Sequence, residues 1–118
     1  MAEKVILGLT EPVKIKGREG RNADIIARID TGATSSSIDM RLAEELGLKQ
    51  IPRSKVVKSA SGVKKRSLAR ARIIIKGMEI EEEFTLADRS QMTYKMLIGQ
   101  NILRKGSVLI DPSLNVIK

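Results

Sequence analysis

Asp30, Thr31 and Gly32 form the part of the sequence best suited to chemistry. Asp30 supplies a carboxylate, and Gly32 lets backbone N–H groups approach it closely because glycine carries no side chain. Hydroxyl groups that can donate hydrogen bonds follow within a short span, at Thr31, Thr34, Ser35, Ser36 and Ser37. Such a loop could hold an ionised carboxylate rigidly. A solvated Asx-turn is the alternative interpretation of an Asp-x-Gly sequence.

The absence of histidine and cysteine narrows the chemistry further. None of the 118 residues is His or Cys. Disulfides, thiol nucleophiles, Cys/His zinc sites and Ser-His-Asp or Cys-His catalysis are therefore excluded. Carboxylates are the main acid–base groups that remain. A chain of this length is expected to form one domain, residues 1–118, with a single hydrophobic core.

A strand must position Asp30. Residues 24–29 alternate in character and place Ile25, Ala27 and Ile29 on one face, which predicts a strand that ends at Asp30. Gly32 then predicts a tight turn. The carboxylate is therefore expected at the end of a strand.

The other segments indicate a β-rich domain. Thr10-Glu11-Pro12 should end a first strand, Pro52 should break the chain, and the N-terminal third should form a β-meander. Strands at this regular spacing indicate a small β-barrel or sandwich with one or two short helices. We expect further strands at residues 5–9, 13–16, 67–76, 78–86 and 96–98, helices at 39–47 and 101–105, a hairpin turning at 59–62, and a final hairpin of 108–110 with 116–117.

The charge of the chain is concentrated. The net charge is +8, and nine of the 22 basic residues lie between positions 53 and 76, where no acidic residue occurs. This concentration favours a polyanionic partner or substrate. Glu81-Glu82-Glu83 is expected to face Arg70 and Arg72 across a strand pair. No N-terminal leader pattern or long apolar stretch is found, so we expect a cytoplasmic protein with no membrane partner.

Two segments carry a resemblance to a known family. Asp-Thr-Gly-Ala-Thr-Ser-Ser-Ser-Ile at 30–38 resembles the catalytic loop of retropepsin-like aspartic proteases, and Met-Leu-Ile-Gly-Gln-Asn-Ile-Leu at 96–103 resembles the element before the C-terminal helix of that fold. The resemblance implies a mostly β, closed barrel with one lobe per chain. It also implies a homodimer, because an aspartic protease needs two carboxylates that share a proton and this chain has one Asp-Thr-Gly.

The resemblance assigns roles to particular residues. Asp30 would be catalytic, and Thr31, Gly32 and Ala33 would support the active-site loop. Ile98 and Gly99 would support it from a second loop. The tip of the predicted hairpin occupies the position of the family's flap, a lid that closes over substrate. Its candidate residues are Ser59, Ala60, Ser61 and Gly62.

The stretches 84–99 and 108–113 look like one microbial branch of the family, catalogued as ATP-dependent zinc proteases and associated with ATP-grasp glutamate ligases. The resemblance implies an ATP-grasp ligase as a partner and, with the basic hairpin, an acidic peptide or protein as substrate. We expect no cofactor: zinc would find no His or Cys ligand, and no phosphate-binding Gly-rich motif is present. For Asp88 and Arg89 we favour an Asx-turn with a structural salt bridge.

Two other functions remain open on the sequence. The basic span 53–76 suits a nucleic-acid-binding barrel, but Phe84 and Tyr94 are the only aromatic residues and cannot build a base-stacking platform. A catalytically silent protein-interaction module on the same fold is the second alternative, since a fold does not fix a function. The main prediction is an aspartic peptidase that hydrolyses peptide bonds through an Asp30 dyad.

Overall fold

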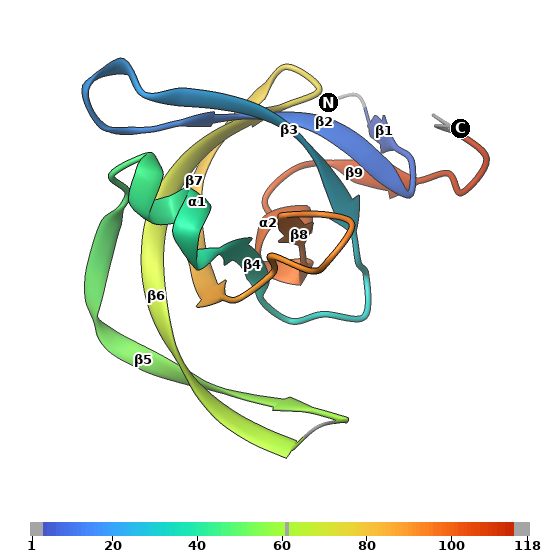
Figure 1. Ribbon diagram of the computed structural model, residues 1–118. Helices are drawn as coiled ribbons and strands as arrows, with labels where there is room; N and C mark the ends of the chain where they lie inside the picture. The colour runs from blue at the N-terminus through green and yellow to red at the C-terminus, as the bar shows by residue number, and fades with distance from the viewer. Residues whose placement is uncertain (1–3, 61, 115–118) are drawn as a thin grey trace.

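Six strands form a closed barrel in the computed structural model, which describes residues 4–60 and 62–114 (Figure 1). Neighbouring strands follow the order β2, β3, β8, β4, β7, β6, and β6 pairs back with β2 to close the ring. The predicted barrel is therefore confirmed. The strands are β2 (Thr10–Lys16), β3 (Asn22–Ile29), β8 (Met96–Ile98), β4 (Ser36–Asp39), β7 (Met78–Ala87) and β6 (Gly62–Ile75).

Three further strands lie outside the ring. β5 (Lys49–Ser59) pairs with β6 and forms a long hairpin that extends from the barrel (Figure 1). β1 (Val5–Leu7) pairs with β9 (Val108–Ile110) as a separate parallel sheet. The helices are short: α1 (Met40–Glu45), α2 (Gln100–Leu103) and a single 3-10 turn, η1 (Arg18–Gly20). No helix among the described residues is long and apolar enough to cross a membrane.

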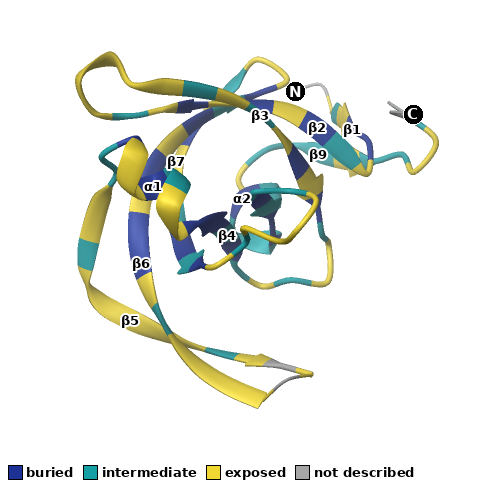
Figure 2. Cartoon of the chain, viewed as in Figure 1, coloured by how far each residue is buried: buried dark blue, intermediate teal, exposed yellow. Residues whose placement is uncertain are grey.

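The core fills the barrel because the strands alternate in character. In β2, Val13 and Ile15 are buried while Lys14 and Lys16 are exposed, as a strand with one face inward requires. Phe84, the only phenylalanine of the chain, is fully buried on β7. Figure 2 shows buried positions along the barrel strands and exposed positions along most of the β5–β6 hairpin.

One expectation about the N-terminal third is wrong, and a second holds only in part. Thr10, Glu11 and Pro12 do not end a strand but begin β2. Glu11 is fully buried and its Oε2 accepts a hydrogen bond from the Gly8 N–H at 2.7 Å, which satisfies a polar group that burial would otherwise penalise. Pro12 lies where β2 pairs with β3 alone, because pairing with β6 begins at Val13.

The expected N-terminal meander is present only in part: β2 and β3 pair as consecutive antiparallel strands, but β1 does not join them. β1 pairs with β9 from the other end of the chain, with Ile6 opposite Leu109. The expected partner of residues 108–110 in a final hairpin was 116–117, which lies outside the described residues. The strand at 108–110 is present, and its described partner is β1.

Pro52 does not break the chain either. It lies within β5, where the register with β6 shifts between Ile51 and Ser54. β5 is an edge strand, and a bulge at an edge is where a proline can be accommodated without losing a ladder bond. The predicted hairpin is therefore present but longer than expected.

Candidate active site

Asp30 lies directly after β3, as predicted. Its backbone N–H donates to the Ile98 carbonyl oxygen at 2.9 Å, which attaches it to β8. Its Oδ1 accepts a hydrogen bond from the Gly32 N–H at 3.0 Å, and among the described residues its Oδ2 has no partner. The carboxyl group is half-buried, so one oxygen is fixed and the other is left for a reactant.

Gly99 allows the loop of residues 30–35, here called the Asp30 loop, to pack closely. A Cβ atom at this position would lie 2.3 Å from the Ser35 carbonyl oxygen and 2.8 Å from that of Ala33. The Gln100 N–H donates to the same Ala33 oxygen at 2.8 Å. The structure thus brings Ala33, Ile98 and Gly99, three of the predicted site residues, against one another.

A chain of hydrogen bonds ties Gly99, on which the Asp30 loop packs, to β4 and β7. The Gly99 N–H donates to the Ser36 Oγ at 2.9 Å, and the Ser36 hydroxyl donates to the Asn101 Oδ1 at 2.7 Å. The Asn101 Nδ2 in turn donates to the Glu83 carbonyl oxygen at 2.9 Å. Ser36 is fully buried, so each of these polar groups needs its partner. The sequence indicated Ser36 only as one of the hydroxyls near Asp30 and Asn101 only as part of the 96–103 motif, and it gave no sign of the bond between their side chains.

Gln100 braces the exposed part of the loop. Its Nε2 donates to the Thr31 carbonyl oxygen at 2.8 Å, and its Oε1 accepts from Arg104 at 3.3 Å. Thr31 and Gly32 themselves are exposed. The second motif therefore supports the Asp30 loop through both backbone and side-chain contacts.

The candidate flap tip lies at the far end of the β5–β6 hairpin. Ser59 and Gly62 are opposite each other where the two strands end, and Ala60 is exposed. Ser61 lies outside the described residues. Figure 1 shows the hairpin extending on the side of the barrel where the Asp30 loop lies.

Asp88 and Arg89 have structural contacts. The Asp88 Oδ1 accepts from the Ser90 hydroxyl and N–H at 2.6 and 3.0 Å, the predicted Asx-turn, and these bonds lower the pKa of Asp88. Arg89 forms no salt bridge within 4 Å in the described part of the chain; its Nε donates to the Tyr94 carbonyl oxygen at 2.9 Å. Burial lowers the pKa of its guanidinium, and the Asp39 carboxylate opposes this.

Asp39 connects this segment to α1. Its Oδ2 caps the helix by accepting from the Leu42 N–H at 3.2 Å, and its Oδ1 accepts from the Arg89 N–H at 2.8 Å. The carboxylate is 5 % exposed, so both oxygens are satisfied by backbone donors. The predicted helix start is confirmed, and the second bond is a contact that the sequence did not indicate.

No three potential metal ligands (His, Cys, Asp or Glu) gather anywhere in residues 4–60 or 62–114. What the loop offers is a carboxylate with one free oxygen, backbone N–H groups and exposed hydroxyls. This set suits acid–base chemistry by Asp30, provided that a second acid completes it.

The closed barrel with two short helices is the fold of retropepsin-like proteases. The family described as "Retropepsin-like aspartic endopeptidase RimB" matches residues 44–118, so the chain belongs to this RimB-like family. The matched residues include Ile98 and Gly99 but begin after the Asp30 loop. A comparison with curated proteins finds no significant match.

Solved structures share the fold at low sequence identity. A Legionella pneumophila protein of unknown function superposes with a TM-score of 0.67 and 19% identity, over 95% of this chain and 96% of its own. EIAV protease, solved with an inhibitor, gives 0.64 and 18%, over 89% and 93%. Simian foamy virus protease gives 0.58 and 17%, over 80% and 91%. These likenesses establish the fold and leave the activity of this chain to be argued from its residues.

Proposed function

We propose that the protein is a homodimeric, metal-independent aspartic endopeptidase, with residues 1–118 forming one lobe. The observation that carries the proposal is Asp30 at the end of β3, with Oδ1 held by Gly32 and its loop packed on Gly99. Family membership supports peptide hydrolysis by such a carboxylate. One chain supplies one such loop, so a twofold axis beside Asp30 provides the second acid.

In this dimer the two Asp30 carboxyls share one proton, because two like charges that close cannot both be ionised. The ionised Asp30 takes a proton from a water molecule, whose oxygen attacks the scissile carbonyl carbon. The partner subunit's Asp30 donates its proton to the carbonyl oxygen. The proton gained from water then passes to the leaving nitrogen as the C–N bond breaks, and a proton from the tetrahedral intermediate returns the pair to its starting state.

The neighbouring residues support this chemistry. Gly32 holds the carboxylate through its N–H, and Thr31, exposed beside it, would link the two loops across the axis. Ala33 is fixed by the Gln100 N–H. The hairpin tip at Ser59–Gly62 would close over the substrate and exclude water.

We further propose an acidic peptide or protein as substrate and the cytoplasm as the location. Lys58, Lys64, Lys65 and Arg66 have no ion pair within 4 Å among the described residues, so their positive field is available to attract a negatively charged chain. A glutamate-adding ATP-grasp ligase is the partner that the resemblance to the microbial branch suggests.

A peptide-library digest of wild type and Asp30→Asn tests the proposal. Asp24→Asn is the matched control, because it makes the same chemical change at an exposed position of the same strand. Asp30→Asn should abolish cleavage, Asp24→Asn should preserve it, pepstatin should inhibit, and a chelator should have no effect. Cleavage that survives Asp30→Asn or stops with chelator would contradict the assignment.

The dimer is tested by dilution. If two chains form one site, specific activity should fall as the protein is diluted below its dimer dissociation constant, in step with the mass measured by sedimentation. A monomer with undiminished activity would refute the shared site. Binding of RNA that weakens steeply with salt, in a protein with no peptidase activity, would favour the nucleic-acid alternative instead. Absence of both activities would favour a silent interaction module.

A further inference from the structure

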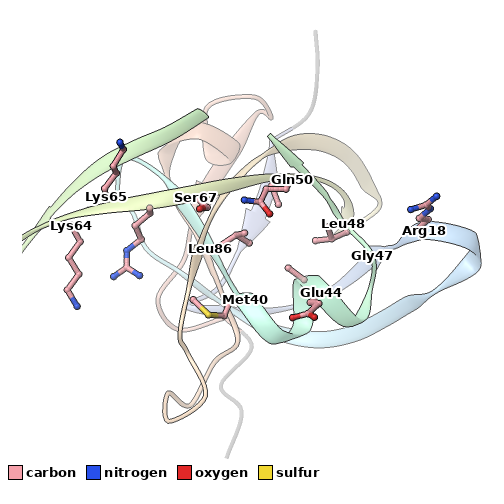
Figure 3. A pocket seen from close by; sticks show the side chains of 13 residues that line it. Arg18, Met40, Glu44, Gly47, Leu48, Gln50, Lys64, Lys65, Ser67 and Leu86 are labelled. Carbon is pink, nitrogen blue, oxygen red and sulfur yellow. The ribbon is translucent and has the colours of Figure 1, made fainter. Parts of the chain in front are cut away.

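A groove separates α1 from the base of the β5–β6 hairpin (Figure 3). Its volume is about 640 Å³, within the size range of small-molecule sites. Residues 30–35 and 98–99 do not line it. It is therefore separate from the Asp30 loop, although Lys64, Lys65 and Arg66, which line it, are also proposed above to attract an acidic substrate.

One side of the groove is apolar. Aliphatic surface comes from Ala43 of α1, from Leu48 after that helix and from Leu86 of β7. Met40 also lines the groove and is 48 % exposed. An unbranched, polarizable methionine adapts to ligands of different shapes. Covering this surface would remove apolar area from water, which favours binding of an apolar group.

The opposite side is cationic. Lys64 and Arg66 are two residues apart on β6, and side chains at that spacing share one face of a strand; Figure 3 shows Lys65, between them, extending to the other side of β6 from Lys64. Arg66 is half-buried. Neither Lys64 nor Arg66 has an ion pair within 4 Å in the described part of the chain, so both charges lack a counter-charge.

Other basic residues of the same span are neutralised. Arg70 pairs with Glu81 at 3.1 Å and Arg72 with Glu81 at 3.5 Å, across the β6–β7 ladder. Arg53 pairs with Glu83. The basic residues of the hairpin without an ion pair in residues 4–60 and 62–114, Lys64 and Arg66 among them, thus lie beyond the reach of the β7 glutamates and beside the groove. Glu44, on the helix side, disfavours an anion there and directs it toward β6.

We propose that this groove binds a small amphipathic anion, with its apolar part against Met40, Leu48 and Leu86 and its carboxylate, phosphate or sulfonate group between Lys64 and Arg66. Such a ligand contacts α1 and the hairpin at once. Its binding would restrain the hairpin relative to the barrel, which makes the groove a regulatory site for the lid. Ligand binding in the groove does not depend on whether Asp30 hydrolyses peptides, whereas the regulatory role rests on the proposed function of the hairpin as a lid.

Three probes and two variants test it. The probes are anilinonaphthalene sulfonate (aromatic), octanoate (aliphatic) and inorganic phosphate, which has no apolar part. Lys64→Ala/Arg66→Ala removes two groove charges. Lys55→Ala/Lys58→Ala is the matched control, because it removes two hairpin charges that do not line the groove. Binding is measured by fluorescence or calorimetry, thermal unfolding verifies that each variant folds, and amide shifts of Ala43 and Ser67 locate the site.

We expect one saturable site for at least one amphipathic probe, with phosphate binding at least about tenfold more weakly. The groove variant should weaken that probe by about tenfold or more and the control by less than about twofold. The tighter of the two amphipathic probes identifies the apolar part as aromatic or aliphatic. Equal loss in both variants, no loss in either, phosphate binding as tightly as both probes, or no saturable binding below ~1 mM would each overturn the proposal.

Discussion

Gly99→Ala should show how much the close packing of the Asp30 loop on Gly99 contributes to the stability of the fold. Gly99 has φ −107° and ψ −169°, an extended conformation that any residue can adopt, so the backbone itself tolerates alanine. The added Cβ, however, would lie 2.3 Å from the Ser35 oxygen, 2.7 Å from the Ser35 carbonyl carbon and 2.8 Å from the Ala33 oxygen. All three are backbone atoms, so no side chain can rotate away.

The cost follows from these contacts. Overpacking typically costs about 1–3 kcal/mol, and a clash with backbone on two residues places Gly99→Ala near the upper end, about 3 kcal/mol. The unfolding entropy of a chain of this size converts 3 kcal/mol into a fall in Tm of about 12 °C. Because the loop must move to admit the methyl group, the Gly32 N–H to Asp30 Oδ1 bond should be disturbed as well.

Thermal unfolding and backbone amide NMR shifts measure both effects. Gly77→Ala is the control: its φ of +78° penalises alanine, but no atom lies within 4 Å of the added Cβ. It should cost about 1–2 kcal/mol of left-handed strain and leave the shifts of Gly32 and Ala33 unchanged. If Gly99→Ala keeps its Tm within about 2 °C of wild type and the loop shifts do not change, the steric argument is wrong.

Three other substitutions have defined outcomes. Asp39→Ala should lower the free energy of unfolding by about 2 kcal/mol, since it removes the α1 cap and leaves the Arg89 N–H unpaired; a change below about 0.5 kcal/mol in urea titration would contradict this. Ser90→Ala should raise the pKa of Asp88 toward its ordinary value, because the hydroxyl bond that lowers it is lost; NMR titration of the carboxyl carbon measures the shift. Because the pKa of Asp88 is lowered in the folded state, its ionised carboxylate stabilises the fold at pH values above the unfolded-state pKa. This stabilisation is lost as the pH falls through the folded-state pKa. Arg70→Gln should likewise raise the pKa of Glu81, whose strongest hydrogen bond comes from Arg70, and an unchanged titration would show that Arg72 suffices.

Local patterns predicted the elements that hold the candidate site. The alternation at Ile25, Ala27 and Ile29 gave the strand before Asp30, and Asp39 with Gly47 marked the ends of the helix; Asp39 caps α1 and Gly47 has a positive φ. Both signals act within a few residues, so they need no tertiary information. The expected pairing of the glutamates with Arg70 and Arg72 is confirmed for Glu81 and, at 3.7 Å from Arg70, for Glu83, whereas Glu82 pairs with Lys105.

The pairing of distant strands and the partners of buried polar groups could not be predicted from the sequence. Nothing near Val5–Leu7 indicates that its partner is Val108–Ile110, because strand partners are selected by tertiary packing. Glu11 looked like a strand end because a buried carboxylate is rare without a partner. Its partners include the Gly8 N–H and, at 3.9 Å, Lys76, and neither can be recognised as a partner from the local sequence. The hydrogen bond between the Ser36 and Asn101 side chains could not be predicted either, because the two residues are 65 positions apart in the sequence. Whether Asp30 is catalytic stays a prediction.

β6 belongs to both the barrel and the hairpin without interruption. From Leu68 to Ile75 it pairs with β7, and from Gly62 to Arg70 it pairs with β5, so the two pairings overlap at Leu68–Arg70. A displacement of the tip would therefore bend β6 near Ser67, opposite the irregularity of β5 between Ile51 and Ser54. Arg66 and Ser67, which line the groove, lie at that point, so a ligand bound in the groove would stiffen the hairpin where it bends.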